Sequence, residues 1–494
     1  MRQRPIEISK MRPARIFRAN WRDFLSEKYN KRLKRPNAQA FRSGSLLVGS
    51  LLALVACAPQ NPPMMQATLA MPMTLELPPV KLFNVTPQLA TPVLANADLT
   101  RDFIELSFQL ESGRPLPFFT RFDGPITVYA APSLNQIGQR DLQQLLARFR
   151  SEAGLSITLS RSSDARIVIE AIPRSRIQST VSGAACFVVP NVRGWAEFQR
   201  ARNNGRLDWT TLRSRTTATV FVPSDAPPQE VRDCLHEELA QGLGPLNDLF
   251  RLENSVFNDD NFHSVLTPYD MLMLRAYYHP SLANGMTRDD VATRLPTIFA
   301  QLNPAGAALR PTSTIDGNSA WEAAINASMT GSLSFSRRTN AAENAVRLAN
   351  STTLPAQSRA FSLFALGQLK FRSDPGVAYG AFRAADGIYS QQQSTEIQSA
   401  HVKVQLAGFA LSAGDATTTL RLTDEAIPVA YAHQNAAILA SLMMLRAEAP
   451  DLLGRPQEAA EQRLDSLGWA RYGFGSDDTV RRKLAEISAL NPAI

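Results

Sequence analysis

The segment TTATVFVPSDAPPQEVRDCLHEELAQGLGP, residues 216–245, constrains the fold more than any other part of the chain. It opens with a β-branched run, which is typical of a strand. Two prolines then introduce an apolar stripe at helical spacing, made of Val231, Leu235 and Leu239. Ser224 or Asp225 can cap this helix, and Gly244, followed by proline, is expected to end it in a left-handed conformation. The segment therefore predicts a strand, a short turn and a long helix.

Shorter patterns on the N-terminal side of this segment predict the rest of an α+β domain. The runs PITVYA (125–130) and ARIVIEAI (165–172) are rich in β-branched residues, as strands are. Between them, residues 134–154 carry the spacing of an amphipathic helix. We therefore expect a small mixed sheet with helices in a domain that spans residues 98–300.

Three motifs in this domain resemble those of known zinc peptidases. They are HEELAQGLG (236–244), LENSVFND (252–259) and LTPYDMLMLRAYYHP (266–280). The first resembles the HExxHxxGxxH helix of the metzincins and matrixin-like peptidases, and the others stand where those families carry their Met-containing turn and C-terminal helix. Together the three motifs resemble still more closely a proteobacterial family known only as domain of unknown function 2927. The resemblance implies a zincin-like fold and is uninformative about activity.

The metal-ligand pattern of the peptidase helix is altered in this chain. A helix supplies two zinc ligands from positions i and i+4, but the i+4 position from His236 is Ala240, which cannot bind a metal. Shifting the match by one residue puts Glu238 at the position of the general base, and all three histidines are then replaced. Their substitutes are Glu237, Gln241 and Asn247. One carboxylate and two neutral amides are a poor ligand set for zinc or calcium.

Three interpretations of this helix remain open. In the favoured one, the domain keeps the zincin shape without a cofactor, and Glu237 hydrogen-bonds its i+4 neighbour or nearby backbone. In the second, the helix belongs to an atypical zinc metallopeptidase with His236 on the metal and Glu237 or Glu238 as the general base. In the third, an unusual metal site recruits Asp248 or His263. The acidic run NDDN (258–261) is expected to be a solvated turn and not a ligand cluster. The candidate metal ligands over these alternatives include His236, Gln241, Asn247 and Asp248.

The C-terminal part of the chain predicts a helical repeat. After a linker at 301–318, residues 319–494 are rich in Ala and Leu and lack a strand pattern. Asp374 and Asp415 are 41 residues apart, which suggests a repeated unit of helix, short turn and helix. The predicted pairs are 357–371 with 375–391, 394–412 with 416–432, and 434–449 with 456–470. They resemble tetratricopeptide-like repeats, which usually bind a protein or peptide partner; a plain helical bundle is the alternative.

The N-terminal segment predicts export and lipidation. Residues 1–42 hold 13 Lys and Arg against 3 Asp and Glu, and the uncharged run 43–56 that follows suits a signal peptide and is too short to span a bilayer. This run leads into LVAC, which resembles the lipobox of bacterial lipoproteins and implies that Cys57 is lipidated. The alternative is an ordinary cleaved signal peptide with a chance cysteine. We therefore expect a signal peptide over 1–56 and a membrane anchor in the cell envelope, in the outer membrane facing the periplasm. The Pro-, Met- and Ala-rich residues 57–97 are predicted to be a tether.

Charge and cysteine usage narrow the function further. The formal net charge is +8, but the residues from Cys57 onward carry only −2 of it. A nucleic-acid partner is therefore not expected. Two further cysteines, Cys186 and Cys234, would meet oxidising conditions after export, so we expect a disulfide between them, with free buried thiols as the alternative.

These features together predict an exported envelope lipoprotein. Its zincin-like domain is expected to be non-catalytic, and its helical repeats are expected to bind a protein, so that the whole acts as a binding or scaffolding protein. The alternative is an atypical zinc metallopeptidase that uses the helix at 236–244.

Overall fold

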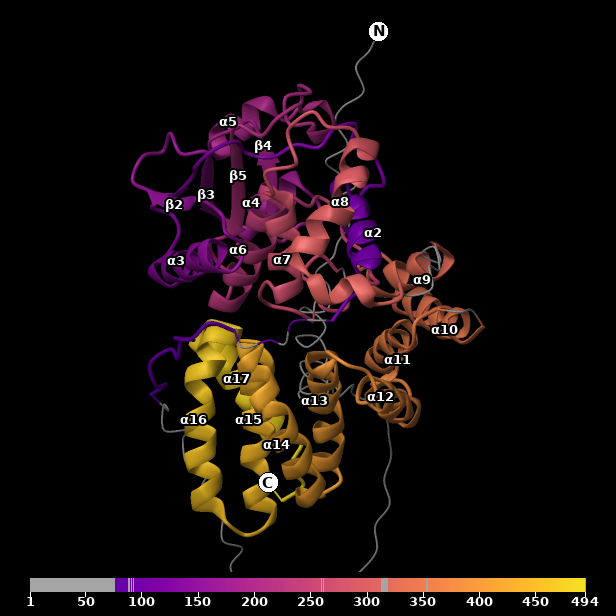
Figure 1. Cartoon of the computed structure of the whole chain (residues 1–494). Helices are drawn as coiled ribbons and strands as arrows, with labels where there is room; N and C mark the ends of the chain where they lie inside the picture. The colour runs from indigo at the N-terminus through magenta and orange to yellow at the C-terminus, as the bar shows by residue number, and fades with distance from the viewer. Residues whose placement is uncertain are drawn as a thin grey trace, which may run out of the picture.

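The computed structural model describes residues 76–87, 89, 91, 93–258, 260, 262–311, 319–351 and 354–493. The predicted signal peptide at 1–56, the lipidation site Cys57 and most of the proposed tether lie outside the described residues. Figure 1 shows a sheet-containing part above an all-helical part. We refer to residues 96–308 as the sheet domain and to residues 319–493 as the helical region.

The sheet domain is built on five strands in the order β2-β1-β3-β5-β4. The strands are β1 Ile126–Ala130, β2 Ile157–Ser160, β3 Ile167–Ile172, β4 Phe187–Pro190 and β5 Ala218–Pro223. All neighbouring strands are parallel except β4, which pairs antiparallel with β5 at one edge. The three strands predicted from β-branched runs are present, while β2 and β4, of four residues each, were not predicted.

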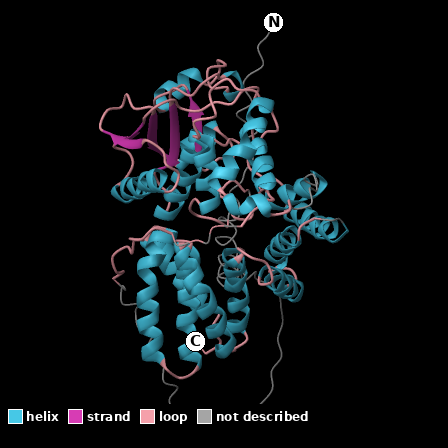
Figure 2. Ribbon diagram, viewed as in Figure 1, coloured by secondary structure: helices cyan, strands magenta, loops and turns pink. Residues whose placement is uncertain are grey.

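Helices cover both faces of this sheet (Figure 2). They are α2 Asn96–Ser107, α3 Gln136–Ser151, α4 Arg174–Thr180, α5 Trp195–Ala201, α6 Pro228–Leu243, α7 Pro268–Tyr277 and α8 Arg288–Leu302. The larger core lies between the sheet and helices that include α3 and α6. A smaller aromatic core, with Trp195, Phe198 and Phe221, fills the opposite face under α4 and α5. The predicted combination of a small mixed sheet with helices is confirmed.

The helical region consists of consecutive antiparallel helices. They are α9 Ser319–Met329, α10 Phe335–Ser351, α11 Ala356–Lys370, α12 Pro375–Tyr389, α13 Glu396–Ser412, α14 Ala416–Ala432, α15 Ala436–Leu452, α16 Pro456–Phe474 and α17 Asp477–Ser488. Each of the six helices predicted from the sequence is present. The all-α character of this region is thereby confirmed.

The turns of the helical region explain the repeated spacing in the sequence. The side chains of Asp374 and Asp415 accept hydrogen bonds from the backbone N–H groups three residues later, at the starts of α12 and α14. Gly414 and Gly454 have φ values of +76° and +71°, which a residue with a Cβ rarely adopts. The repeat step therefore marks equivalent turns between helices of one pair.

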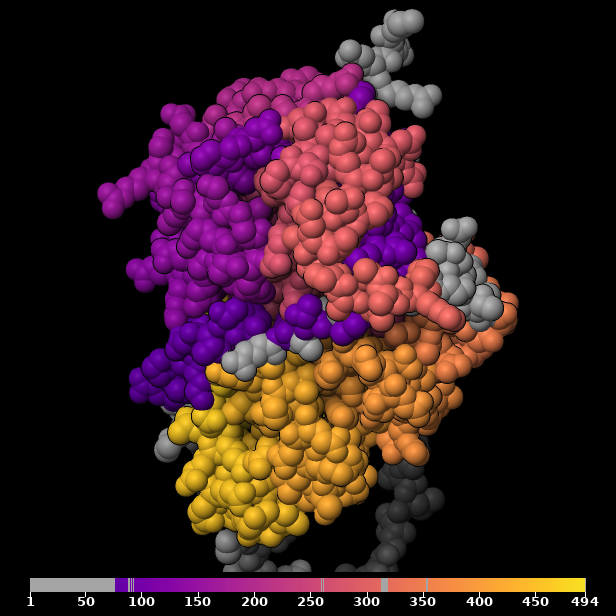
Figure 3. Space-filling view, viewed as in Figure 1, coloured from indigo at the N-terminus to yellow at the C-terminus, as the bar shows by residue number. Residues whose placement is uncertain are grey.

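Residues 76–87, which we call the strap, are bound along the boundary between the two parts of the molecule. The backbone N–H of Lys81 donates to Gly468 O at 3.0 Å, and Arg471 Nη1 donates to Pro78 O at 2.8 Å, both on α16. On the side of the sheet domain, Gln144 Nε2 of α3 donates to Phe83 O at 3.1 Å. Figure 3 shows these indigo residues lying across the boundary. Over its described residues the proposed tether is therefore packed against the protein.

None of the helices within the described residues is long and apolar enough to cross a membrane.

Candidate functional site

Helix α6 follows the predicted strand, but its N-terminus differs in detail. The helix starts at Pro228, with Pro227 as the N-cap residue and no side-chain cap. The predicted cap by Ser224 or Asp225 is therefore wrong. Asp225 Oδ1 instead accepts a hydrogen bond at 2.8 Å from the backbone N–H of Arg174. Proline at N1 has no N–H group, so one fewer donor at this end of the helix needs a partner, and its fixed φ favours the start of a helix.

A buried arginine closes the C-terminus of α6. The guanidinium of Arg215 donates to Gln241 O and Gly242 O, both at 2.8 Å, and to Gly244 O at 2.7 Å. Its side chain is only 3% exposed, and the ring of Trp209 lies 4.9 Å from its charge centre. Carbonyls at the end of a helix have no N–H partner within the helix, so the arginine pairs groups that would otherwise be unpaired.

Gly244 ends α6 in a conformation other than the expected left-handed one. Its φ is −157°, which is extended backbone open to any residue. The constraint here is space, because a Cβ at this position would lie 3.0 Å from Cγ of Tyr277. Glycine is thus required by the close approach of the α7 ring rather than by backbone strain.

His236 is used in an internal hydrogen bond. Its Nδ1 accepts from the backbone N–H of Leu266 at 3.0 Å, and the residue is 5% exposed. Burial lowers the pKa of His236 well below its usual value, and the positive charges of Arg148 and Arg232 lower it further. The imidazole is therefore neutral and ties α6 to the segment that leads into α7.

The side chains that replace the zinc ligands contact the end of α2 and the loop after it. Gln241 Nε2 donates to Glu111 Oε1 at 3.1 Å, and Asn247 Nδ2 donates to Glu105 O at 3.1 Å. The backbone N–H of Leu246 also donates to Leu106 O at 3.0 Å. The face of α6 that would hold a metal in the shifted register is thus occupied by residues 105–111.

The remaining candidate residues lie on the same helix and the turn that follows it. Glu238 is 5% exposed, Glu237 is half-buried, and Asp248, just after the helix, is half-buried. The amide of Gln241 donates to Glu111 in the loop after α2. Within the described part of the chain, no group of three or more His, Cys, Asp or Glu side chains is placed so that it could hold a metal ion.

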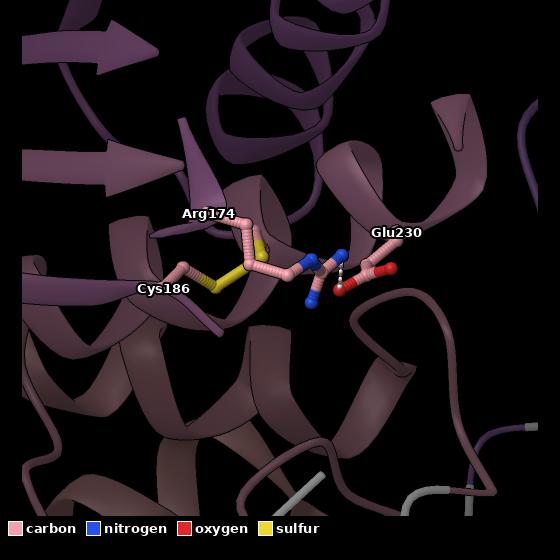
Figure 4. The surroundings of a disulfide bond; sticks show 4 residues. Arg174, Cys186 and Glu230 are labelled. Carbon is pink, nitrogen blue, oxygen red and sulfur yellow. Dashed lines mark hydrogen bonds and ion pairs between the residues drawn. A yellow bond between two sulfur atoms is a disulfide. The ribbon is translucent and has the colours of Figure 1, made fainter. Parts of the chain in front are cut away.

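A disulfide fixes α6 to the edge of the sheet, as the cysteine count predicted. Cys186, next to β4, is bonded to Cys234 of α6, with the two Cα atoms 6.0 Å apart. Figure 4 shows the bond together with the nearby ion pair, in which Arg174 Nη2 lies 2.7 Å from Glu230 Oε1. The bond excludes Cys234 from acting as a free thiol beside His236.

The loop at 250–266 leaves the sheet domain and enters the helical region. Phe262, 1% exposed, packs its ring against those of Phe361 and Phe364 of α11 and of Tyr389 at the end of α12. The backbone carbonyl of Glu253 accepts from Gln398 Nε2 at 2.8 Å. The loop thereby joins the two parts through apolar and polar contacts.

Part of this loop was expected to be a solvated turn, and that prediction is wrong. Asn258 is 5% exposed and Asp260 is 9% exposed. Asn258 Nδ2 donates to Leu252 O at 2.9 Å, and Asp260 Oδ1 accepts from the backbone N–H of Phe262 at 3.0 Å. These polar side chains shape a buried loop, so their sequence pattern reflects turn formation and not exposure.

A second set of contacts surrounds Arg232 of α6. Its guanidinium lies 5.2 Å from the ring of Phe83 in the strap and 5.2 Å from the ring of Tyr472 in α16, and it donates to Gln434 O. Tyr472 in turn donates to Asp141 Oδ2 of α3 at 2.7 Å. Burial raises the pKa of Asp141, while the charge of Arg232 lowers it. We call this group of five residues the arginine node.

Residues 96–297 match the family model described as "Protein of unknown function (DUF2927)". The match covers the sheet and α6 and ends within α8. The resemblance inferred from the three motifs is therefore confirmed. No curated protein and no solved structure matches the chain.

Sequence reasoning missed the residues that hold the candidate site in place. Arg215 and Arg232 are both buried cations that carry no motif. The position of Arg215, just before β5, is a signal that could have been used. A helix that follows a strand runs back along it, so the C-terminus of α6 lies near the start of β5. No comparable signal points to Arg232, since its partners come from parts of the chain far away in sequence.

Proposed function

We propose that this protein is an exported envelope lipoprotein that acts as a binding or scaffolding protein. In this proposal the DUF2927 domain is a zincin-like fold without catalytic activity, and it holds the helical region in a fixed position. The observation that carries the proposal is that the polar side chains of α6 and the turn after it bind other parts of the same molecule. The side chains of His236, Gln241 and Asn247 all make hydrogen bonds within the molecule.

The opposite end of α6 supports the same role. Gln229 Nε2 donates to Asn435 Oδ1 at 3.0 Å, and its Oε1 accepts from the backbone N–H of Ala437 at 2.8 Å. Arg232 adds the contacts of the arginine node. In a peptidase this helix would face a substrate, whereas here its N-terminal end is buried against the turn between α14 and α15, the start of α15, and α16.

An exposed aromatic group on the helical region supports a protein partner. Tyr379 of α12 is 42% exposed, and its ring lies 5.3 Å from that of Phe409 in α13. Phe409 in turn packs 4.9 Å from the ring of Phe371. Exposed aromatic residues of this kind are enriched at protein interfaces.

Metal analysis of the purified mature protein tests the non-catalytic role. After dialysis against a buffer that contains zinc, we expect the protein to hold no stoichiometric zinc. We also expect it to cleave peptides no faster than a Glu238→Gln variant does. Stoichiometric zinc that is lost in His236→Ala, together with cleavage that is lost in a normally folded Glu238→Gln variant, would instead establish the metallopeptidase.

Detergent phase partitioning tests the anchor. We expect the wild-type protein to enter the detergent phase and the Cys57→Ser variant to stay in the aqueous phase or to remain unprocessed, because stable anchoring requires acyl chains on that cysteine. Equal partitioning of the two proteins would reject lipidation at Cys57.

A further inference from the structure

Three of the five histidines in the chain meet where the 250–266 loop contacts the helical region. They are His263 in the loop, His401 in α13 and His433 at the end of α14. The rings of His263 and His433 are 5.6 Å apart, and the ring of His401 is 4.9 Å from that of Phe262. We call this group the histidine junction.

The hydrogen bonds of these rings suit neutral imidazoles. His263 Nε2 lies 2.8 Å from Glu253 O, so this nitrogen carries the proton. His401 Nε2 is 3.4 Å from Nδ2 of Asn435, which is a donor. His433 Nδ1 is buried and has no hydrogen-bond partner. A cavity of about 330 Å³ between the two parts is lined by His263 and His433.

Protonation of His263 and His433 is unfavourable while the two parts are docked. Burial lowers the pKa of His263 to about 4. Burial, together with the neighbouring His263 and His401, lowers the pKa of His433 to about 3. In water a histidine has a pKa of about 6.5, so each ring binds a proton more tightly once it is exposed.

We propose that the histidine junction is an acid-sensitive joint, which keeps α13 and α14 docked on the 250–266 loop while its rings are neutral and releases them when they are protonated. Two or three positive charges within this half-buried cluster would repel each other, as the neighbouring His263 and His401 already disfavour a charge on His433. The proposal concerns the joint alone and is independent of whether the DUF2927 domain is catalytic.

The titratable groups that lie at the junction are Glu253 and Asp260 in the loop, Tyr389 at the end of α12 and Glu396 at the start of α13. Other titratable groups lie on the surrounding elements and are engaged elsewhere: His236 and Arg232 on α6, Asp270 on α7 and Lys403 on α13. Lys403 is paired with Glu425 at 2.9 Å. Glu396 is exposed at the rim of the cavity and can interact with water in either state.

Glu253 has an effect of opposite sign to that of the histidines. Burial and the nearby Asp260 raise the pKa of Glu253 to about 8, so docking through this group weakens as the pH rises toward 8. The lowered histidine pKa values make docking weaken as the pH falls below 6.5. Docking is therefore strongest near pH 6.5, and the two histidines together outweigh Glu253 on the acid side.

The experiment measures docking through the distance between two fluorophores. The labels are placed by Arg161→Cys in the sheet domain and Leu453→Cys between α15 and α16, in the full chain carrying Cys57→Ser; both sites are exposed. We expect the urea-dependent docking equilibrium to weaken by about 100-fold between pH 6.5 and pH 4, from the pKa shifts of His263, His433 and Glu253.

The matched variants separate the joint from general acid unfolding. In a triple variant, His263→Gln with His401→Gln and His433→Gln, docking should no longer weaken in acid, because only Glu253 remains and it acts in the opposite direction. His433→Gln alone should show an intermediate loss, and His279→Gln, outside the junction, should behave like the wild type. A triple variant that undocks at the same pH as the wild type, or a wild type that stays fully docked at pH 4, would overturn the proposal.

Discussion

Arg215 shows how strongly the candidate helix depends on one residue outside it. Its guanidinium satisfies three carbonyls at the end of α6 and is itself almost fully buried. A side chain without N–H donors would leave these buried carbonyls without hydrogen-bond partners. Single buried residues of this kind decide whether α6 keeps its length and direction.

The substitution Arg215→Met is expected to destabilise the protein by roughly 3 kcal/mol, because hydrogen bonds to a charged donor are lost and buried carbonyls stay unpaired. Urea unfolding of the sheet domain measures this loss. Arg161→Met, at an exposed position, should change stability by less than about 0.5 kcal/mol. Equal stability of the two variants would show that Arg215 has no such role.

Gly244→Ala is expected to cost about 1–3 kcal/mol, because its new methyl group would press on the ring of Tyr277. Gly205→Ala provides the control, since a Cβ there meets nothing within 4 Å and its φ lies outside the left-handed region. Thermal melting of the two variants should differ clearly. If crowding against Tyr277 causes the loss, the double variant Gly244→Ala with Tyr277→Leu should have a higher melting temperature than Gly244→Ala alone.

At the scale of elements, the sequence predicted regular structure well and irregular contacts poorly. Helix α6 and the six predicted repeat helices follow local signals, namely prolines, capping residues and apolar spacing. The short edge strands β2 and β4 escaped because four residues carry too little pattern to separate a strand from a loop. The burial of Asn258 and Asp260 could not be predicted, because the loop that contains them packs through Phe262 against α11, which comes much later in the chain. The likeness of α6 to a zinc-binding helix could be read from the sequence, whereas the contacts that occupy its polar face could not.

The disulfide between the start of β4 and α6 lends itself to a test at this scale. Its 48-residue separation corresponds to about 4 kcal/mol in the chain-entropy model. We expect the double variant Cys186→Ala with Cys234→Ala to unfold at a lower urea concentration than the oxidised wild type and at the same concentration with or without reductant. Alkylation of two free thiols in the non-reduced wild-type protein would show that the bond does not form.

On the scale of the whole molecule, the arginine node and the histidine junction connect the same two parts at different places. The node uses α3, α6, α16 and the strap, whereas the junction uses the 250–266 loop with α13 and α14. The apolar rings of Phe83 and Phe262 each belong to the core of the helical region although neither lies in it by sequence. Residues from outside the helical region therefore complete its core, and unfolding one part should weaken the other.

This coupling predicts the outcome of Phe83→Ala. Removing the ring of Phe83, which is 3% exposed and lies 4.6 Å from the ring of Trp469, should cost about 3 kcal/mol. The cost should appear in the stability of both parts, which hydrogen exchange can measure separately in α6 and in α16. Val85→Ala, in the same strap but 50% exposed, is the matched control. A loss confined to the strap itself would show that the two parts fold independently.

The strap also determines the order in which the molecule can be completed. Its hydrogen bonds with α16 join residues that are between 384 and 393 positions apart. A chain that emerges from its N-terminus has the strap first and its partners last, so this segment must wait for almost the entire polypeptide before it can bind. The closing of so long a loop is entropically costly and slow compared with the formation of local helices. Final docking of the strap is then the step at which a nascent chain becomes the finished protein.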